Sequence, residues 1–144
     1  MKMERTPNER QVLKRFLSRY FRATEKKAVL EGRLSRMQVE LRRPGGGEAS
    51  AGIAEIEDRL HRQAASAEKC ALEIMDVLEL LPADSTERTI LELRHLDCKP
   101  WKDIHRAVYL TRSPCFEHYN KGLDQLLTMP EVRRKLNLKN GTGG

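Results

Sequence analysis

The fold of this chain is decided by residues 84–127, DSTERTILELRHLDCKPWKDIHRAVYLTRSPCFEHYNKGLDQLL. Apolar residues recur in this stretch at helical spacing, in three groups separated by polar or helix-breaking residues. A short helix followed by a tight turn and a longer helix is the sequence pattern of a helix-turn-helix. The stretch therefore predicts three short helices, of which the last two are joined by such a turn.

Each predicted helix begins at residues suited to that position. Asp84, with Glu87 three residues later, has the pattern of a capping box. Pro100 is tolerated in the first turn of the second helix, because its missing N–H would have no partner there, and Thr111 is a good N-cap for the third. The side chains predicted to face inward are Ile90, Leu91, Leu93, Leu96, Trp101, Ile104, Ala107, Val108, Cys115, Phe116, Tyr119, Leu123, Leu126 and Leu127.

Charged and apolar residues of this stretch also follow a recognisable order. They are Glu87-Arg88, Ile90-Leu91, Leu93-Arg94, Trp101, Ile104, Val108, Leu110-Thr111-Arg112, Lys121-Gly122-Leu123 and Leu126. This order resembles region 4 of sigma-70-type transcription factors, and the Trp before the Ile makes it more similar to short phage regulators of the ArpU/RinA type. The resemblance covers about a third of the chain. It implies a DNA-binding transcription regulator of phage or prophage origin that binds double-stranded DNA and contacts RNA polymerase.

In a helix-turn-helix the first residues of the second helix meet base edges. Arg112 could bind guanine, Glu117 could accept from cytosine, and Lys121 would meet a phosphate. The predicted DNA-binding residues are Thr111, Arg112, Ser113, Phe116, Glu117, Asn120 and Lys121, with Lys99, Lys102, Arg133, Arg134 and Lys135 as candidate backbone contacts. Phe116 could instead belong to the core. A solvated helix face would show the same polar stripe, so the resemblance decides in favour of DNA contact.

Two features of the module (residues 84–128) depart from a typical DNA-binding domain. Gly122 replaces the family's Ala and lowers helix propensity by up to about 1 kcal/mol, and His105 replaces a small residue. Residues 82–128 hold seven Lys/Arg and seven Asp/Glu, so the module has no clear basic footprint. Two alternatives follow: an adaptor that docks on RNA polymerase without DNA affinity, and a DNA-recognition subunit of the phage packaging machinery, similar to a small terminase.

Two long amphipathic helices are predicted ahead of the module, within an arm of residues 8–81. Apolar residues recur at three-four spacing from Leu13 to Leu41 and again from Ile53 to Leu81. Pro and glycines in residues 43–52 predict a reversal between the helices. The predicted antiparallel register places these layers opposite one another: Leu41 and Ile53, Leu34 and Leu60, Lys27 and Ala67, Tyr20 and Ile74, Leu13 and Leu81. The expected fold class is therefore all-α, a long antiparallel helical hairpin followed by a helix-turn-helix.

Opposite charges accompany this pairing. Residues 1–43 hold 13 Lys/Arg and five Asp/Glu, whereas residues 44–81 hold three and eight. Such complementarity favours packing of one helix on the other. Because a lone two-helix arm buries little surface, we expect self-association, as a homodimer or another oligomer. Residues 129–144 are expected to form a short basic helix and, from Asn137 on, a disordered tail.

Composition and motifs exclude several classes of protein. No apolar run approaches the roughly 20 residues of a membrane span, and MKMERTPNERQ at the start has no apolar signal core, so a cytoplasmic location without membrane contact is expected. His95, Cys98, His105, Cys115 and His118 are the only clustered soft ligands, and they lack the paired spacing of a metal site. No catalytic set or phosphate-binding loop stands out. We therefore expect no enzyme activity, cofactor or metal.

Overall fold

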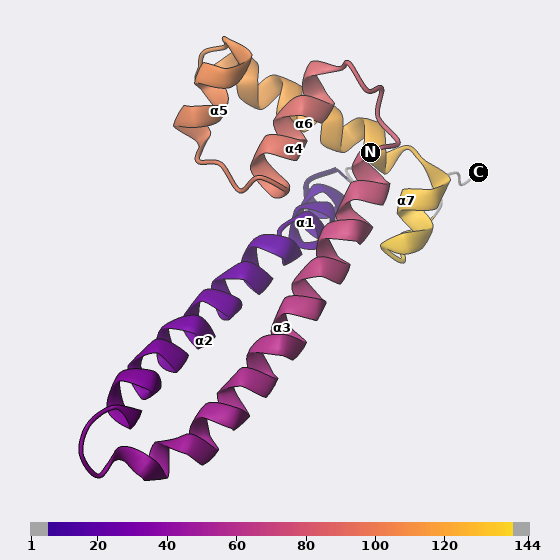
Figure 1. The fold of residues 1–144 in the computed structure, drawn as a ribbon. Coiled ribbons are helices and arrows are strands. Elements are labelled where there is room, and N and C mark those ends of the chain that lie inside the picture. Colours follow the sequence, from indigo (N-terminus) through magenta and orange to yellow (C-terminus); the bar gives the residue numbers. More distant parts are fainter. Residues whose placement is uncertain (1–5, 140–144) are drawn as a thin grey trace.

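The structure, a computed structural model, describes residues 6–139 and is all-α over that range (Figure 1). Two long antiparallel helices project from a group of shorter ones, which confirms the predicted fold class. The elements are α1 (Thr6–Leu17), α2 (Arg19–Leu41), the short 3-10 helix η1 (Gly46–Glu48), α3 (Ala49–Leu78), α4 (Thr86–His95), α5 (Trp101–Val108), α6 (Arg112–Leu127) and α7 (Pro130–Lys135).

The first predicted helix is divided in two at Ser18. The sequence pattern predicts one continuous helix through this position, but Ser18 lies between α1 and α2 with φ −86° and ψ 0°. Leu13 and Leu17 are completely buried in the same cluster as residues of α4 and α6. The break lets α1 follow α6 while α2 follows α3, so α1 belongs to the module as much as to the arm.

The reversal in the arm is shorter than predicted. The helix α3 begins at Ala49, so Gly52 is helical and only residues 42–48 form the turn. Gly45 has φ +80°, a conformation that favours glycine. A Cβ at Gly46 would collide with the carbonyl oxygen of Glu40. These two glycines make the tight reversal possible.

The early start of α3 changes the register of the hairpin. Gln63 Nε2 donates to the carbonyl oxygen of Ala23 at 3.1 Å, and the methyl group of Met37 lies against Gly52. Both partners on α2 lie at least one helical turn nearer the N-terminus than the predicted register places them. The predicted layer of Leu41 opposite Ile53 at the tip is therefore displaced, because a shorter turn brings earlier residues of α3 opposite each residue of α2. Nearer the module the shift is smaller, since Arg19 pairs with Glu73.

The hydrophobic core lies where the arm meets the module, rather than along the arm. No described side chain between Ala23 and Ala67 is buried. The seam residues near the tip are only partly covered, and Leu41 is 39% exposed. The core residues are Leu13, Phe16, Leu17, Ile74, Val77, Leu78, Leu81, Ile90, Leu91, Ile104, Cys115, Tyr119, Leu123, Leu126, Leu127 and Val132. The tip of the arm therefore adds little to the stability of the fold.

The residues at which α5 and α6 begin agree with the predictions, whereas the residue that caps α4 differs. Thr111 is the N-cap of α6, and Pro100 is the N-cap of α5. The predicted capping box is wrong, because Ser85, not Asp84, caps α4 by accepting from the N–H of Arg88 at 3.1 Å. Glu87 is therefore free of the cap and turns into the module. Of the predicted inward residues, Ala107 is exposed.

The C-terminal segment is partly ordered. The helix α7 coincides with the predicted short basic helix. Asn137–Lys139 were expected to be disordered, but Leu138 donates to the carbonyl oxygen of Arg133 at 2.8 Å and packs against the core. Residues 140–144 of the predicted tail lie outside the described residues. None of the helices in the described range is long and apolar enough to cross a membrane.

Candidate nucleic-acid interface

A tight turn joins α5 to α6, as predicted. Tyr109 ends α5 in the left-handed conformation, with φ 57° and ψ 40°, and its N–H points back to the carbonyls of Arg106 and His105. The N–H of Leu110 donates to His105 at 3.1 Å, and Thr111 then begins α6. The Tyr109 side chain is 91% exposed. A left-handed residue between two short helices is what allows the chain to change direction within three residues.

Gly122 lets α6 approach α4 closely. A Cβ at this position would lie 2.8 Å from Cδ1 of Leu91 and 3.1 Å from Cβ of Glu87, which is shorter than normal packing allows. Gly122 is buried at this contact. Gly122 was predicted only to lower the helix propensity of α6, but in the structure it permits the close contact between α6 and α4.

A polar cluster lies where α4 meets α6. His118 Nδ1 is 2.5 Å from Oε2 of Glu87, and Lys121 Nζ is 3.9 Å from the same oxygen. Burial alone would raise the pKa of Glu87, but the hydrogen bond with His118, a backbone hydrogen bond and the charge of Lys121 together lower it. Glu87 is therefore an ionised carboxylate within the module, and it neutralises part of the charge that Lys121 would offer to a phosphate.

A second buried polar pair lies between the end of α4 and the middle of α6. His95 Nε2 and the hydroxyl of Tyr119 are 2.9 Å apart and both residues are buried. Burial, with the nearby charges of Arg94 and Lys14, lowers the pKa of His95 to about 4, and burial raises the pKa of Tyr119 to about 12. At neutral pH the pair is therefore an uncharged hydrogen bond that fixes α6 against α4.

The helix α1 lies along the C-terminal half of α6, which the sequence did not predict. Arg10 donates to both carboxylate oxygens of Asp124, at 2.8 and 2.6 Å. Lys14 Nζ lies 5.8 Å from the ring centre of Tyr119. Asn120, beside this contact, is only partly exposed. The half of α6 nearest the turn, together with the side of the helix that carries Lys121, is therefore the part that remains open to a large partner such as duplex DNA.

Most predicted contact residues are at the surface. Those exposed are Thr111, Arg112, Ser113, Glu117, Lys121, Lys99, Lys102, Arg134 and Lys135. Phe116 is partly buried, and its ring centre lies 4.6 Å from that of Trp101, which favours the core interpretation of this residue. The guanidinium of Arg112 lies 5.9 Å from the Phe116 ring centre. Phe116 therefore supports the first turn of α6 from behind.

Arg133 cannot serve as the predicted backbone contact. Its side chain is 7% exposed, and its guanidinium donates to Glu9 on α1 at 2.8 and 3.1 Å. It also donates to the carbonyl oxygens of Leu127, at 2.9 Å, and Lys139. The prediction that Arg133 contacts DNA is therefore wrong, because the side chain is buried and paired with Glu9. It fastens α7 and the end of α6 to α1, a contact between residues far apart in the sequence.

The histidines and cysteines considered as metal ligands take part in separate contacts. The described residues contain no group of three or more His, Cys, Asp or Glu that could hold a metal ion. Cys115 is completely buried, and burial raises the pKa of its thiol. His105 packs against Trp101 and Phe116, with its Nε2 buried.

Comparisons of the chain with protein-family models, with curated proteins and with solved structures found no match. The resemblance to sigma-70 region 4 therefore stays a prediction from the sequence.

Proposed function

We propose that this protein is a non-enzymatic transcription regulator that binds duplex DNA with α6. The observation that supports this most is the exposed stripe of Arg112, Ser113, Glu117 and Lys121 on a helix whose opposite side is fixed by the core. A helix held in this way can enter a major groove without losing its own packing. The sequence resemblance points to the same function and adds a contact with RNA polymerase and a phage or prophage origin.

Charge substitutions on α6 test the proposal. Arg112→Ala should weaken binding to a selected site by about 1–3 kcal/mol and relax base preference near it. Lys121→Ala should weaken binding to all DNA sequences equally. The effect should be slight, because Glu87 already neutralises part of the Lys121 charge. Gel shifts at several salt concentrations would measure both. Arg36→Ala, at an exposed position on α2, is the matched control and should leave binding unchanged.

Equal and negligible effects of Arg112→Ala and Lys121→Ala would remove α6 as the DNA-contacting helix. A target for these measurements can be selected from random or genomic DNA. Binding to RNA polymerase without any DNA affinity at low salt would instead select the adaptor function. The contact of Arg10 with Asp124 favours that second candidate, because it places α1 over part of the helix that would enter the groove.

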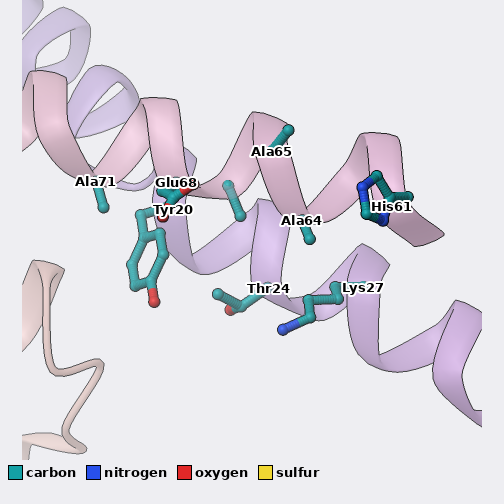
Figure 2. A pocket seen from close by; sticks show the side chains of 9 residues that line it. Tyr20, Thr24, Lys27, His61, Ala64, Ala65, Glu68 and Ala71 are labelled. Carbon is teal, nitrogen blue, oxygen red and sulfur yellow. The ribbon is translucent and has the colours of Figure 1, made fainter. Parts of the chain in front are cut away.

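We also propose that the arm mediates self-association. Its large exposed apolar residues are Phe21, Val29, Val39 and Leu41 on α2 and Leu72 and Met75 on α3. A groove of about 480 Å³ runs between the two helices, with Tyr20, Thr24 and Lys27 along one edge and small side chains such as Ala64 and Ala71 along the other (Figure 2). The excess of positive charge on α2 and of negative charge on α3 suits pairing with a second copy.

The oligomeric state separates the regulator from the packaging subunit. A regulator of this design is expected to be a dimer, whereas a closed ring of many copies in solution would favour the packaging function. Sedimentation equilibrium of the full chain distinguishes the two.

A further inference from the structure

A pocket at the junction of arm and module is lined by donors and aromatic rings. Its volume is about 390 Å³, and it lies between the break at Ser18, the end of α4 and the middle of α6. Lys14 and Ser18 come from the arm side, Arg94 from α4, and Asn120 from α6. None of its lining residues is acidic. This distinguishes it from the neighbouring hollow on the outer face of α6, where Glu117 and Asp124 are part of the lining.

Lys14 and Arg94 bring two positive charges to this pocket without a carboxylate partner. Among the residues that the structure describes, no Asp or Glu oxygen lies within 4.0 Å of either side chain. Three other arginines of this fold, Arg10, Arg19 and Arg133, are each paired with an acid. The two unpaired cations therefore leave a net positive potential in a concave site.

Arg94 is held in place although it has no acidic partner. Its guanidinium lies 4.8 Å from the ring centre of Trp101 and donates to the carbonyl oxygen of Lys99 at 3.0 Å. These two contacts fix the planar fork, which is the geometry that binds phosphate oxygens in pairs. Trp101 also packs against Phe116 and Tyr119, so its ring is engaged with neighbouring side chains rather than free to stack on a base.

Two neutral donors complete the site. Ser18 stands at the N-cap of α2, but its hydroxyl makes no capping hydrogen bond. Asn120 is partly buried on the side of α6 that faces α1. Within the described range, neither side chain has a hydrogen-bond partner, so both can donate to an oxygen that enters the pocket.

We propose that this pocket binds a phosphate group, held by Lys14 and Arg94 and assisted by Ser18 and Asn120. Phosphate offers several strong acceptor oxygens and negative charge, which match two cations and two neutral donors. The group can come from a free nucleotide or from the backbone of DNA, since Asn120 lines both this pocket and the hollow beside Glu117 and Lys121 on α6. The DNA source rests on the proposed function, and the free-nucleotide source does not.

Trp101 provides the assay, because it is the only Trp of the sequence and lines the pocket. Its emission would be titrated in the full chain with sodium phosphate, with AMP, and with a random duplex of about 20 base pairs. Lys14→Gln and Arg94→Gln are the test variants, and Lys26→Gln and Arg36→Gln, at exposed positions on α2, are the matched controls. Circular dichroism melts confirm folding, and Lys14→Gln decides the test if Arg94→Gln does not fold.

If the pocket binds free nucleotides, AMP should change the Trp101 emission in a saturable way. The affinity for AMP should then fall at least about tenfold in both test variants and in neither control. A backbone site gives a change with the duplex alone, and each test variant lowers the salt slope of DNA binding by about one. Test variants that match the controls with every ligand would overturn the proposal. If Arg112→Ala impairs DNA binding while Lys14→Gln does not, the phosphate site fails and the proposed function stands. If the protein binds AMP but no DNA, the phosphate site stands and the proposed function fails.

Discussion

Gly122 and Gly32 are both helical glycines, yet alanine should have opposite effects at the two positions. Alanine gains up to about 1 kcal/mol of helix propensity in each case. At Gly32 the new Cβ would lie 3.7 Å from Arg36, an ordinary contact, so Gly32→Ala should stabilise the fold by that amount. At Gly122 the Cβ would overlap Leu91 and Glu87, and overpacking costs about 1–3 kcal/mol. Gly122→Ala should therefore lower the unfolding free energy by about 1 kcal/mol, measured by urea denaturation. An increase at both positions would mean that α4 and α6 are not in close contact.

Arg133 and Arg134 are adjacent but should differ strongly in their contribution to stability. Arg133 is buried and paired with Glu9, and breaking a buried pair costs about 3–5 kcal/mol. Arg134 is exposed, where single substitutions usually change stability by about 0.5 kcal/mol or less. Thermal and urea unfolding of Arg133→Ala and Arg134→Ala would compare them. In DNA binding the order should reverse, with only Arg134→Ala reducing the salt slope. Similar stabilities would show that α7 is not fastened to α1 through Arg133.

His95 should make the fold less stable as the pH falls. Its pKa is about 4 in the folded chain and about 6.5 when unfolded, so between these values only the unfolded state takes up the proton. Its contribution is therefore complete above about pH 6.5 and is lost as the pH falls towards 4. Replacing it in His95→Gln should remove about 2–3 kcal/mol of the decline in unfolding free energy between about pH 7 and 4.5. The exposed His61→Gln is the control. An unchanged pH profile in His95→Gln would assign the decline to other groups.

At the scale of the elements, local patterns predicted the helices well and their mutual placement less well. Three-four spacing predicted both arm helices, and Thr111 correctly marked the start of α6. Where α3 begins could not be derived, since residues 43–52 permit a reversal of several lengths, and the register follows from that length. The break at Ser18 has no helix-breaking residue to announce it.

The candidate site was predictable only where it depends on local sequence. The outward stripe of α6, such as Arg112 and Glu117, follows from helical spacing. The pair Arg133–Glu9 and the contact of Arg10 with Asp124 join residues more than one hundred positions apart. No local pattern marks such pairs, because a charged residue that is buried by a distant partner has the same sequence signature as one that faces solvent.

The arm and the module should respond differently to shortening of the arm. No described side chain between Ala23 and Ala67 is buried. A chain in which about four glycines replace residues 31–59 can still close between helices about 10 Å apart. It should unfold cooperatively and bind the same DNA. Its self-association should weaken only in part, because Val39 and Leu41 are removed while the groove beside Tyr20 and Ala71 remains. Circular dichroism melts and sedimentation equilibrium would measure both. Loss of cooperative unfolding would show that the arm tip stabilises the module, and unchanged association would place the dimer contact outside the arm tip.

At the scale of the whole molecule, arm and module share one core and do not form two independent units. Buried side chains of α1 and α3 belong to the same hydrophobic cluster as those of α4 and α6. Arg10 and Arg133 add ion pairs between α1 and the C-terminal helices. A change in the direction of the arm is therefore transmitted to the helix proposed to contact DNA. We therefore expect the arm to set how two copies are placed on DNA.

The helix α2 begins directly after Ser18 and has 23 residues, which makes it about 35 Å long. This length is close to the roughly 34 Å that separates equivalent positions one turn apart on B-form DNA. Arms that pair side by side and parallel would place both modules on abutting half-sites of a palindrome. Arms that overlap head to tail would hold the modules about one turn apart, on the same face of the duplex. Hydroxyl-radical footprints would show which spacing the protein protects.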